Sequence, residues 1–246
     1  MEKALYTLMN GANRNLQAQA VYANNLANIN TVGFRADLID ASRVIDPAVT
    51  PGQKNSESDT ARVSDFSVGQ IEETGRVLDI AVATEGFFAV QAADGTEAYT
   101  RAGDLQIDSS GLLTTGRGDF VLGDGGPISI PTAEKISIGS DGTISVQELG
   151  QNVASVVEID RIKLVNPDIS RLSKGADGLF RVEPGKKAEA DASVQLRSGF
   201  VERSNVNAVS MLTDIIASAR QFEMQVKAMK TVEENSESSA RIMQMS

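Results

Sequence analysis

Apolar residues recur at helical spacing at both ends of this 246-residue chain. Near the N-terminus they follow alternating steps of four and three residues, which is the period of one face of an α-helix. This N-terminal stripe consists of Leu5, Met9, Ala12, Leu16, Gln19, Ala23 and Leu26. A second stripe, in a tail without glycine or proline, consists of Met211, Ile215, Ala219, Phe222, Val226, Met229 and Val232. Both ends are therefore predicted to be amphipathic helices, and Ser204 or Asn205 is expected to cap the start of the second.

The segment between the two ends has the pattern of β-structure. It holds all six prolines and every glycine except Gly11 and Gly33. Short β-branched runs alternate there with Asp-Gly dipeptides, which suit turns that need a positive φ. The runs lie at 87–90, 128–130, 136–138 and 156–159, and the turns at Asp94-Gly95, Asp124-Gly125, Asp141-Gly142 and Asp177-Gly178.

These patterns predict an α+β protein in which N- and C-terminal helices pair as a coiled-coil domain and an all-β central domain is inserted between them. We expect residues 1–45 with 205–246 to form a helical polymerisation domain, 46–68 an extended linker, and 69–204 the β-rich central domain. Pairing of the two helices leaves apolar residues off the main stripes: Leu8, Ala20, Leu212, Ile216 and Met224. A helical hairpin with more than one apolar face needs further helices, and other copies of the chain are the simplest source.

Composition removes most catalytic chemistry from consideration. The chain has no histidine and no cysteine, which excludes a Ser–His–Asp triad, a thiol nucleophile and a thiolate zinc site. Two pairs of neighbouring acids, Asp104 with Asp108 and Asp119 with Asp124, could in principle serve glycoside hydrolysis or calcium binding. The spacing of a calcium loop is absent, however, and aromatic residues make up only 4% of the chain. We interpret these acids as turn formers and expect no enzyme activity, no cofactor and no metal site.

Net charge and hydropathy limit the classes of partner that the chain is expected to bind. The net charge is −10 and the pI about 4.6, so a basic footprint for nucleic acid is missing. No apolar run approaches the length of a membrane span, and the first residues lack the basic and apolar regions of a secretory signal. We therefore expect no nucleic-acid partner and no membrane insertion, and export, if it occurs, without a cleaved signal.

One string near the N-terminus carries a resemblance to a known family. Residues 24–35 read Asn-Asn-Leu-Ala-Asn-Ile-Asn-Thr-Val-Gly-Phe-Arg and resemble the signature that opens bacterial flagellar rod, hook and hook-associated proteins. Blocks at 69–90 and 99–114 resemble the central β-domain of the long rod subunits, although 83–86 departs from the usual glycine-rich turn. Residues 199–207 resemble the family's entry to its last helix, Gly-x-x-Glu-x-Ser-Asn-Val.

The resemblance implies a structural subunit of the flagellar basal-body rod, which crosses the periplasm and self-assembles through its terminal helices. Chain length fits the long rod proteins, and the tail at 222–231 is more similar to the proximal rod protein than to the distal one. The implied partners are copies of itself, other rod subunits and the flagellar type III export apparatus. The residues expected to carry the motif and assembly are Asn24, Asn25, Leu26, Ala27, Asn28, Thr31, Gly33, Phe34, Arg35, Ser204, Asn205, Val206, Ile215, Phe222, Val226 and Met229.

A second hypothesis remains open from the residues alone. A secreted β-domain that binds a ligand, like an adhesin, could carry helical arms that only make it oligomeric. Such a protein would form discrete oligomers, whereas a rod subunit would form filaments or sheets when concentrated.

Overall fold

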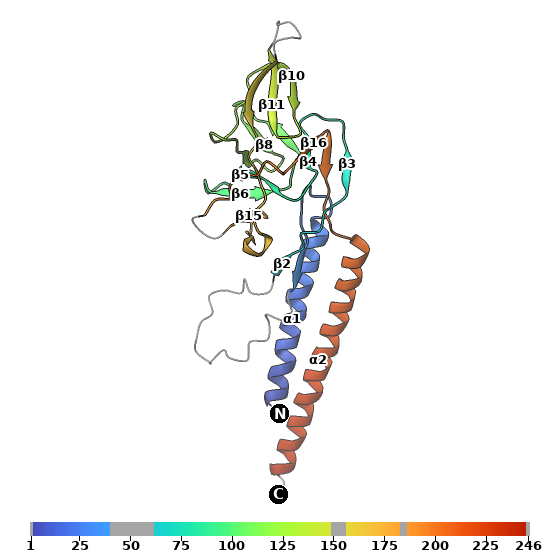
Figure 1. Cartoon of the computed structure of the whole chain (residues 1–246). Helices are drawn as coiled ribbons and strands as arrows, with labels where there is room; N and C mark the ends of the chain where they lie inside the picture. Colours follow the sequence, from blue (N-terminus) through green and yellow to red (C-terminus); the bar gives the residue numbers. More distant parts are fainter. Residues whose placement is uncertain (1, 40–61, 149–155, 183–185, 245–246) are drawn as a thin grey trace. The chain divides into compact units, whose positions relative to one another are not determined.

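The computed structural model describes residues 2–39, 62–148, 156–182 and 186–244, and the chain divides into two compact units (Figure 1). The first unit comprises Met1–Ile29, Ala36–Asp65 and Val206–Ser246. The second comprises Asn30–Arg35 and Phe66–Asn205. Each unit is thus built from segments that lie far apart in the sequence.

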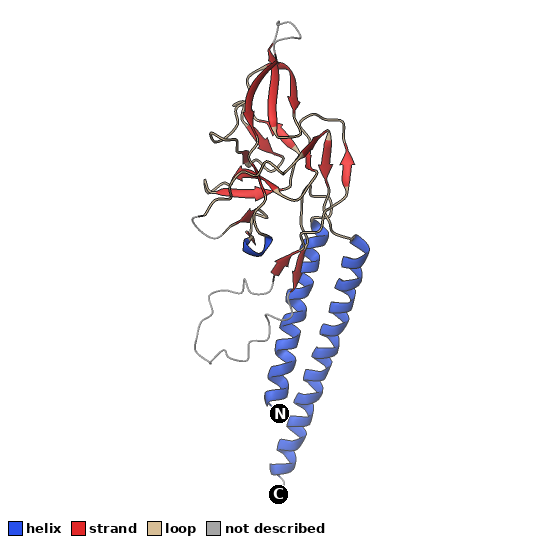
Figure 2. Ribbon diagram, viewed as in Figure 1, coloured by secondary structure: helices blue, strands red, loops and turns tan. Residues whose placement is uncertain are grey.

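The first unit is a pair of antiparallel helices with a small ribbon (Figures 1 and 2). Helix α1 spans Glu2–Ala27 and packs along helix α2, Ala208–Gln244. The strands β1 (Asp37–Ile39) and β2 (Arg62–Ser64) pair antiparallel, and β1 contacts α1. The predicted pairing of the N- and C-terminal helices is confirmed.

The start of α2 differs from the prediction. The Oδ1 atom of Asn207 accepts hydrogen bonds from the backbone N–H groups of Val209 and Ser210, at 3.0 and 3.2 Å. Asn207 is therefore the N-cap, because it satisfies N–H groups that have no partner within the helix. The predicted caps Ser204 and Asn205 lie just before it, in the second unit.

The second unit is made of antiparallel β-structure, as predicted (Figure 2). The largest sheet runs in the order β14-β15-β6-β5-β9-β8-β7, with β13 also paired to β5. Its strands are β5 (Phe87–Gln91), β6 (Glu97–Thr100), β7 (Leu105–Ile107), β8 (Leu113–Thr115), β9 (Phe120–Val121), β13 (Leu164–Val165), β14 (Ser173–Lys174) and β15 (Phe180–Arg181). A 3₁₀ turn, η1 (Ile169–Arg171), precedes β14.

Three smaller sheets complete this unit. One has the order β10-β11-β12 and contains β10 (Ala133–Ile138), β11 (Thr143–Glu148) and β12 (Val156–Arg161). The other two are the pairs β4 (Ile80–Val82) with β16 (Leu196–Ser198), and β3 (Ile71–Glu73) with β17 (Phe200–Glu202). The last strands before α2 therefore pair with the first strands of the unit.

Strand β5 lies between two apolar clusters. Phe88 and Val90 belong to the larger cluster, whereas Phe87 and Ala89 belong to the smaller one, because successive side chains of a strand point to opposite faces. The ring of Phe66 packs on the smaller cluster, with its centroid 6.2 Å from that of Phe87. Burial on both faces explains why 87–90 appears in the sequence as a continuous apolar run.

The Asp-Gly turns are largely confirmed. Gly95, Gly142 and Gly178 have positive φ values of 79°, 87° and 76°. At the fourth predicted turn it is Gly126, not Gly125, that takes the positive φ, at 131°.

The domain boundaries differ from those expected in three places. Residues 30–35, expected in the helical domain, belong to the β unit. The expected linker 46–68 includes strand β2 at Arg62–Ser64, and Phe66 is packed in the β unit. The remainder of that linker, 46–61, lies outside the described residues, and the β unit continues to Asn205.

Candidate assembly site

The side of α1 that faces α2 includes small and polar residues. The Nδ2 atom of Asn15 donates a hydrogen bond to Oε1 of Gln225 at 3.0 Å. A Cβ atom on Gly11 would lie 2.7 Å from Nε2 of the same glutamine, and Ala12 is buried beside it. At this point the seam between the helices therefore depends on the close approach of small and polar residues.

Several of the large residues predicted to form the N-terminal seam lie outside it. Leu5, Met9 and Leu16 are 43%, 47% and 46% exposed. Of the other predicted members, Ala23 is exposed, Gln19 and Leu26 are half-buried, and only Ala12 is buried. The helical period was predicted correctly, but the face that contacts α2 is rotated away from the predicted stripe. We call Leu5, Met9 and Leu16 the outer α1 stripe.

The predicted C-terminal stripe is closer to the observed seam. Ile215, Phe222 and Met229 are half-buried, but Val226 is 43% exposed. Among the α2 side chains that the structure describes, none is fully buried. One partner helix therefore covers only part of the apolar surface of α2.

A second apolar stripe begins at the first turn of α2. Val209, Leu212 and Ile216 are 74%, 49% and 53% exposed. Their spacing of three and then four residues places them on one side of the helix. We call these residues the outer α2 stripe. Isolated exposed apolar side chains are ordinary, whereas side chains aligned on one helical face are typical of a contact surface.

The motif at 24–35 is divided between the two units. Within the helical unit, Asn25 is buried, and its side-chain amide bonds the backbone of Asp37 as a neighbouring strand would. Its Nδ2 donates to the carbonyl of Asp37 at 2.7 Å, and its Oδ1 accepts from the N–H of Asp37 at 2.9 Å. The side chain of Asn28 donates to the carbonyl of Asn24 at 2.9 Å, and α1 ends at Ala27. These bonds end the helix and hold β1 along it.

The remainder of the motif is part of the β unit. The N–H of Gly33 donates to the carbonyl of Glu202 at 2.7 Å. Gly33 has φ +66°, and a Cβ there would lie 2.2 Å from the backbone N of Ala102. A side chain is therefore excluded both by the left-handed conformation and by the close approach of a second backbone segment. Gly33 does not end α1 itself, since it lies several residues beyond Ala27.

Three charged side chains meet beside this glycine. Nη2 of Arg35 lies 2.6 Å from Oε1 of Glu202, and Nη1 of Arg101 lies 3.0 Å from Oε2. The side chains of Arg35, Glu202 and Arg101 are 1%, 0% and 5% exposed. The N–H of Gly69 also donates to Oε1, at 2.8 Å. We call these three side chains the Glu202 cluster, in which one carboxylate is bonded by two guanidinium groups and a backbone amide.

The other motif residues also have contacts or burial within their own units. Nζ of Lys174 is 4.0 Å from the centroid of the Phe34 ring and donates to the carbonyl of Arg35 at 2.7 Å. The amide of Asn205 donates to the carbonyl and hydroxyl of Ser67, at 3.2 and 3.1 Å. Thr31 and Ser204 are half-buried, and Val206 is buried in the helical unit.

Sequence reasoning missed two members of the cluster. Glu202 lies inside the resembling block at 199–207, where an acidic residue directly after buried Val201 was an available signal. No local pattern distinguishes Arg101, whose Nε and Nη2 atoms donate to the carbonyls of Gly86 and Thr84.

The acids weighed as catalytic pairs have structural roles. Oδ1 of Asp108 accepts from the N–H groups of Ser110 and Leu112, at 2.8 and 2.9 Å, as expected of a turn former. Burial raises the pKa of the Asp104 carboxyl, and the charge of nearby Asp79 adds to the rise. Within the described ranges no three acidic side chains converge as a metal site would require.

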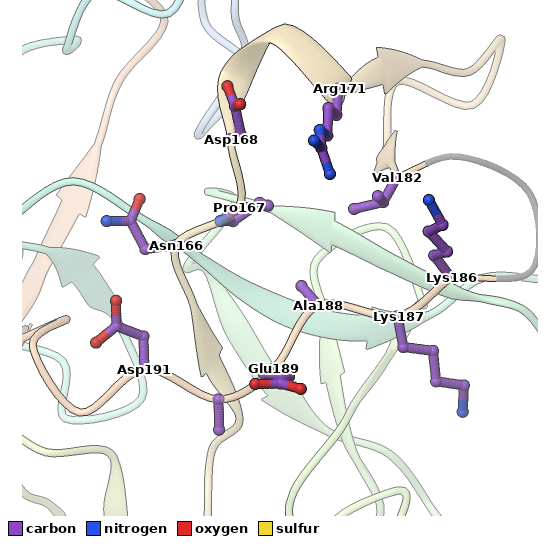
Figure 3. A pocket seen from close by; sticks show the side chains of 11 residues that line it. Asn166, Pro167, Asp168, Arg171, Val182, Lys186, Lys187, Ala188, Glu189 and Asp191 are labelled. Atoms are coloured by element: carbon purple, nitrogen blue, oxygen red, sulfur yellow. The ribbon is translucent and has the colours of Figure 1, made fainter.

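A cavity of about 440 Å³ lies beside η1 in the β unit (Figure 3). Arg171, Lys186 and Lys187 line it together with acidic residues. Two of those acids are already engaged in turns, since Asp168 accepts from the N–H of Ser170 and Asp191 from that of Ser193. The mixed charge selects no ligand class.

In the part of the chain that the structure describes, no helix combines the length and apolar character needed to cross a membrane.

Replacement of Glu202 by alanine should destabilise the β unit strongly. Two buried guanidinium groups would lose their carboxylate, and breaking a buried ion pair in this way costs about 3–5 kcal/mol. Urea unfolding followed by circular dichroism measures the loss. Glu72→Ala is the matched control, because Glu72 lies on the paired strand β3 and forms an exposed ion pair with Arg203. Equal unfolding curves for Glu202→Ala and Glu72→Ala would contradict this role.

Family models of known proteins match the segments that contain the motif and the Glu202 cluster. Residues 5–35 match the family model described as "Flagella basal body rod protein", and residues 197–242 match "Flagellar basal body rod FlgEFG protein C-terminal". Residues 81–146 match "Flagellar hook protein FlgE/F/G D1 domain". The two terminal matches contain Asn25, Arg35 and Glu202.

Relatives that align over nearly the whole chain support the same family assignment. The chain is 40% identical to the flagellar basal-body rod protein FlgF of Salmonella typhimurium and 39% identical to that of Escherichia coli, with all of each chain covered. It is 34% identical to the rod protein FlgG of Bacillus subtilis, over 95% of this chain and 96% of the relative. The resemblance to the proximal rod protein, which is FlgF, is thereby confirmed. The chain belongs to the FlgF family of flagellar basal-body rod proteins.

Proposed function

We propose that the chain is a structural subunit of the flagellar basal-body rod and that it assembles through the outer α1 and outer α2 stripes. The observation that carries this proposal is the exposure of aligned large apolar residues on two helices that already pair with each other. Its relatives are named as rod proteins. The family supports the filament subunit over the adhesin-like alternative, and the chain acts as a building element and not as a catalyst.

The free helix pair is expected to be only marginally stable. Its seam contains small residues, and none of the described side chains of α2 is fully buried. Full burial of a large apolar side chain contributes about 1.5–3 kcal/mol, so the half-exposed stripe residues retain a substantial part of that free energy for a further contact. Helices from neighbouring subunits supply the missing cover in the rod. The partners are copies of the chain and other rod subunits.

The motif residues act within their own units in this proposal. Asn24, Asn25 and Asn28 end α1 and hold β1. Arg35 belongs to the Glu202 cluster, and Gly33 donates to the backbone carbonyl of Glu202. They keep each unit in the form that assembly requires, and the outer stripes make the contacts between subunits.

The flagellar type III export apparatus is the proposed route to the rod, without cleavage of the N-terminus. The first described residues already belong to α1, which carries the outer α1 stripe. Mass spectrometry of the chain from isolated basal bodies should find an N-terminal peptide that starts at Met1 or Glu2. A uniform N-terminus shortened beyond Leu5 would remove part of the stripe and contradict both proposals.

Leu212→Glu should abolish rod assembly while the chain stays folded. Leu212 is 49% exposed, so the free chain should change in stability by no more than about 0.5 kcal/mol, whereas a carboxylate in a covered contact is costly. Ala217→Glu is the matched control, since Ala217 is also exposed on α2 but lies off the outer α2 stripe. Motility and basal-body microscopy, at equal amounts of exported protein, provide the measurement. Normal rods from the Leu212 variant would refute the assignment.

Phe222→Ala should also prevent assembly, for a different reason. A fully buried phenylalanine contributes about 3–5 kcal/mol, and Phe222 is half-buried in the free chain. Part of the loss therefore weakens the helix pair, and the rest is expected only in the rod. Asp124→Ala, at an exposed turn of the β unit, should leave assembly intact. Rods formed by the Phe222 variant, or lost by the Asp124 variant at equal export, would show that the helices do not carry assembly.

A further inference from the structure

The contact among Gly11, Asn15 and Gln225 is a polar point of the seam between the helices. The amides of Asn15 and Gln225 share a partly buried hydrogen bond of 3.0 Å. Gly11 leaves the space that the glutamine amide occupies, because a Cβ there would lie 2.7 Å from its Nε2 atom. Glycine costs about 1 kcal/mol relative to alanine inside a helix, so its presence in the middle of α1 has a local packing reason.

A second contact along the seam confirms the alignment of the helices. Nδ2 of Asn25 lies 3.8 Å from the Sδ atom of Met211. From Gly11 to Asn25 is fourteen residues, and from Gln225 back to Met211 is also fourteen, so the helices keep one antiparallel register over two heptads. Midway between the two contacts, Ala18 and Ser218 should therefore face each other.

We infer that Asn15 and Gln225 are positioning residues that select this register of α1 on α2. Helices that slipped by one heptad would place Gln225 opposite Leu8 or Tyr22, and Asn15 opposite Ser218 or Val232. In each slipped arrangement one of the two amides faces an apolar side chain, Leu8 or Val232, and loses its partner. A polar pair at a seam position fixes register in this way in coiled coils, at some cost in stability.

The inference rests on the proposed function, because the register sets the axial offset between the outer α1 and outer α2 stripes. One heptad corresponds to a shift of about 10 Å along the helix. A neighbouring subunit that fits both stripes in one register would miss at least one of them in the other. Asn15 and Gln225 would thus control assembly without touching the neighbour.

The test separates register from stability. In Asn15→Leu with Gln225→Leu, the seam becomes more apolar, so helicity and melting temperature should stay equal or rise. Because the chain has no native cysteine, Ala18→Cys with Ser218→Cys can report the register through the yield of an intramolecular disulfide, which requires Cα atoms closer than about 7 Å. The double leucine variant should lower that yield several-fold and abolish motility.

The exchanged variant, Asn15→Gln with Gln225→Asn, keeps one amide pair in the seam and should restore both disulfide yield and motility. A matched control, Gln17→Leu with Gln221→Leu, adds the same apolar groups at exposed positions outside the seam and should keep the disulfide yield. Unchanged disulfide yield in the Asn15/Gln225 leucine variant, or retained motility despite a lower yield, would overturn the inference. The cysteine reporter is read on the free chain, so failure of register selection is distinguishable from failure of the outer stripes, which Leu212→Glu tests.

Discussion

The carboxylate of Glu202 is the point at which distant parts of the β unit meet. It forms ion pairs with Arg35, which follows α1, and with Arg101, which follows β6, and it accepts a hydrogen bond from the amide of Gly69 near the start of the unit. Such a group is stable in an apolar interior only when all of its partners are present. The β unit is therefore complete only with residues 30–35 and with the strand that leads toward α2. A fragment limited to the continuous segment Phe66–Asn205 would keep Arg101 with Glu202 but would lack Arg35.

The helical unit obeys a different constraint, since two helices cannot cover all of their apolar faces. In this chain the side of α1 that faces α2 carries Gly11, Ala12 and Asn15, and the large residues Leu5, Met9 and Leu16 remain outside. That distribution differs from a stable isolated coiled coil, in which the large apolar residues lie in the seam. It suits a subunit whose helices gain most of their stability from neighbours. The specificity of helix pairing comes from close approach and a polar contact. The larger hydrophobic contribution comes from residues that are covered only on assembly.

The two units are thus stabilised by different means. The β unit has an apolar cluster on each face of β5 and a buried ionic cluster formed by Arg35, Arg101 and Glu202. The helical unit has few fully buried side chains among those described: Ala12, Val21, Asn25, Ala36, Asp37 and Val206. The aligned exposed apolar residues of the helical unit indicate that this unit needs a partner. The family motif is divided between the same two units. Asn25 bonds β1 in the helical unit, and Arg35 pairs with Glu202 in the β unit.

Local patterns in the sequence were sufficient for the elements and the class of fold. The apolar steps of three and four residues predicted both helices, and the Asp-Gly turns separated the short strands, because period and turn chemistry depend on neighbouring residues. The string at 24–35 was sufficient for the family. The tertiary structure alone decided which face of α1 meets α2, that Asn207 caps α2, and that Arg35, Arg101 and Glu202 form one cluster. Periodicity identifies the faces of a helix but not the one that finds a partner, which depends on the shape of the opposing surface at Gly11 and Gln225. Likewise, the sequence alone does not show that a charged residue is buried, because its counter-ion lies a hundred or more residues away along the chain.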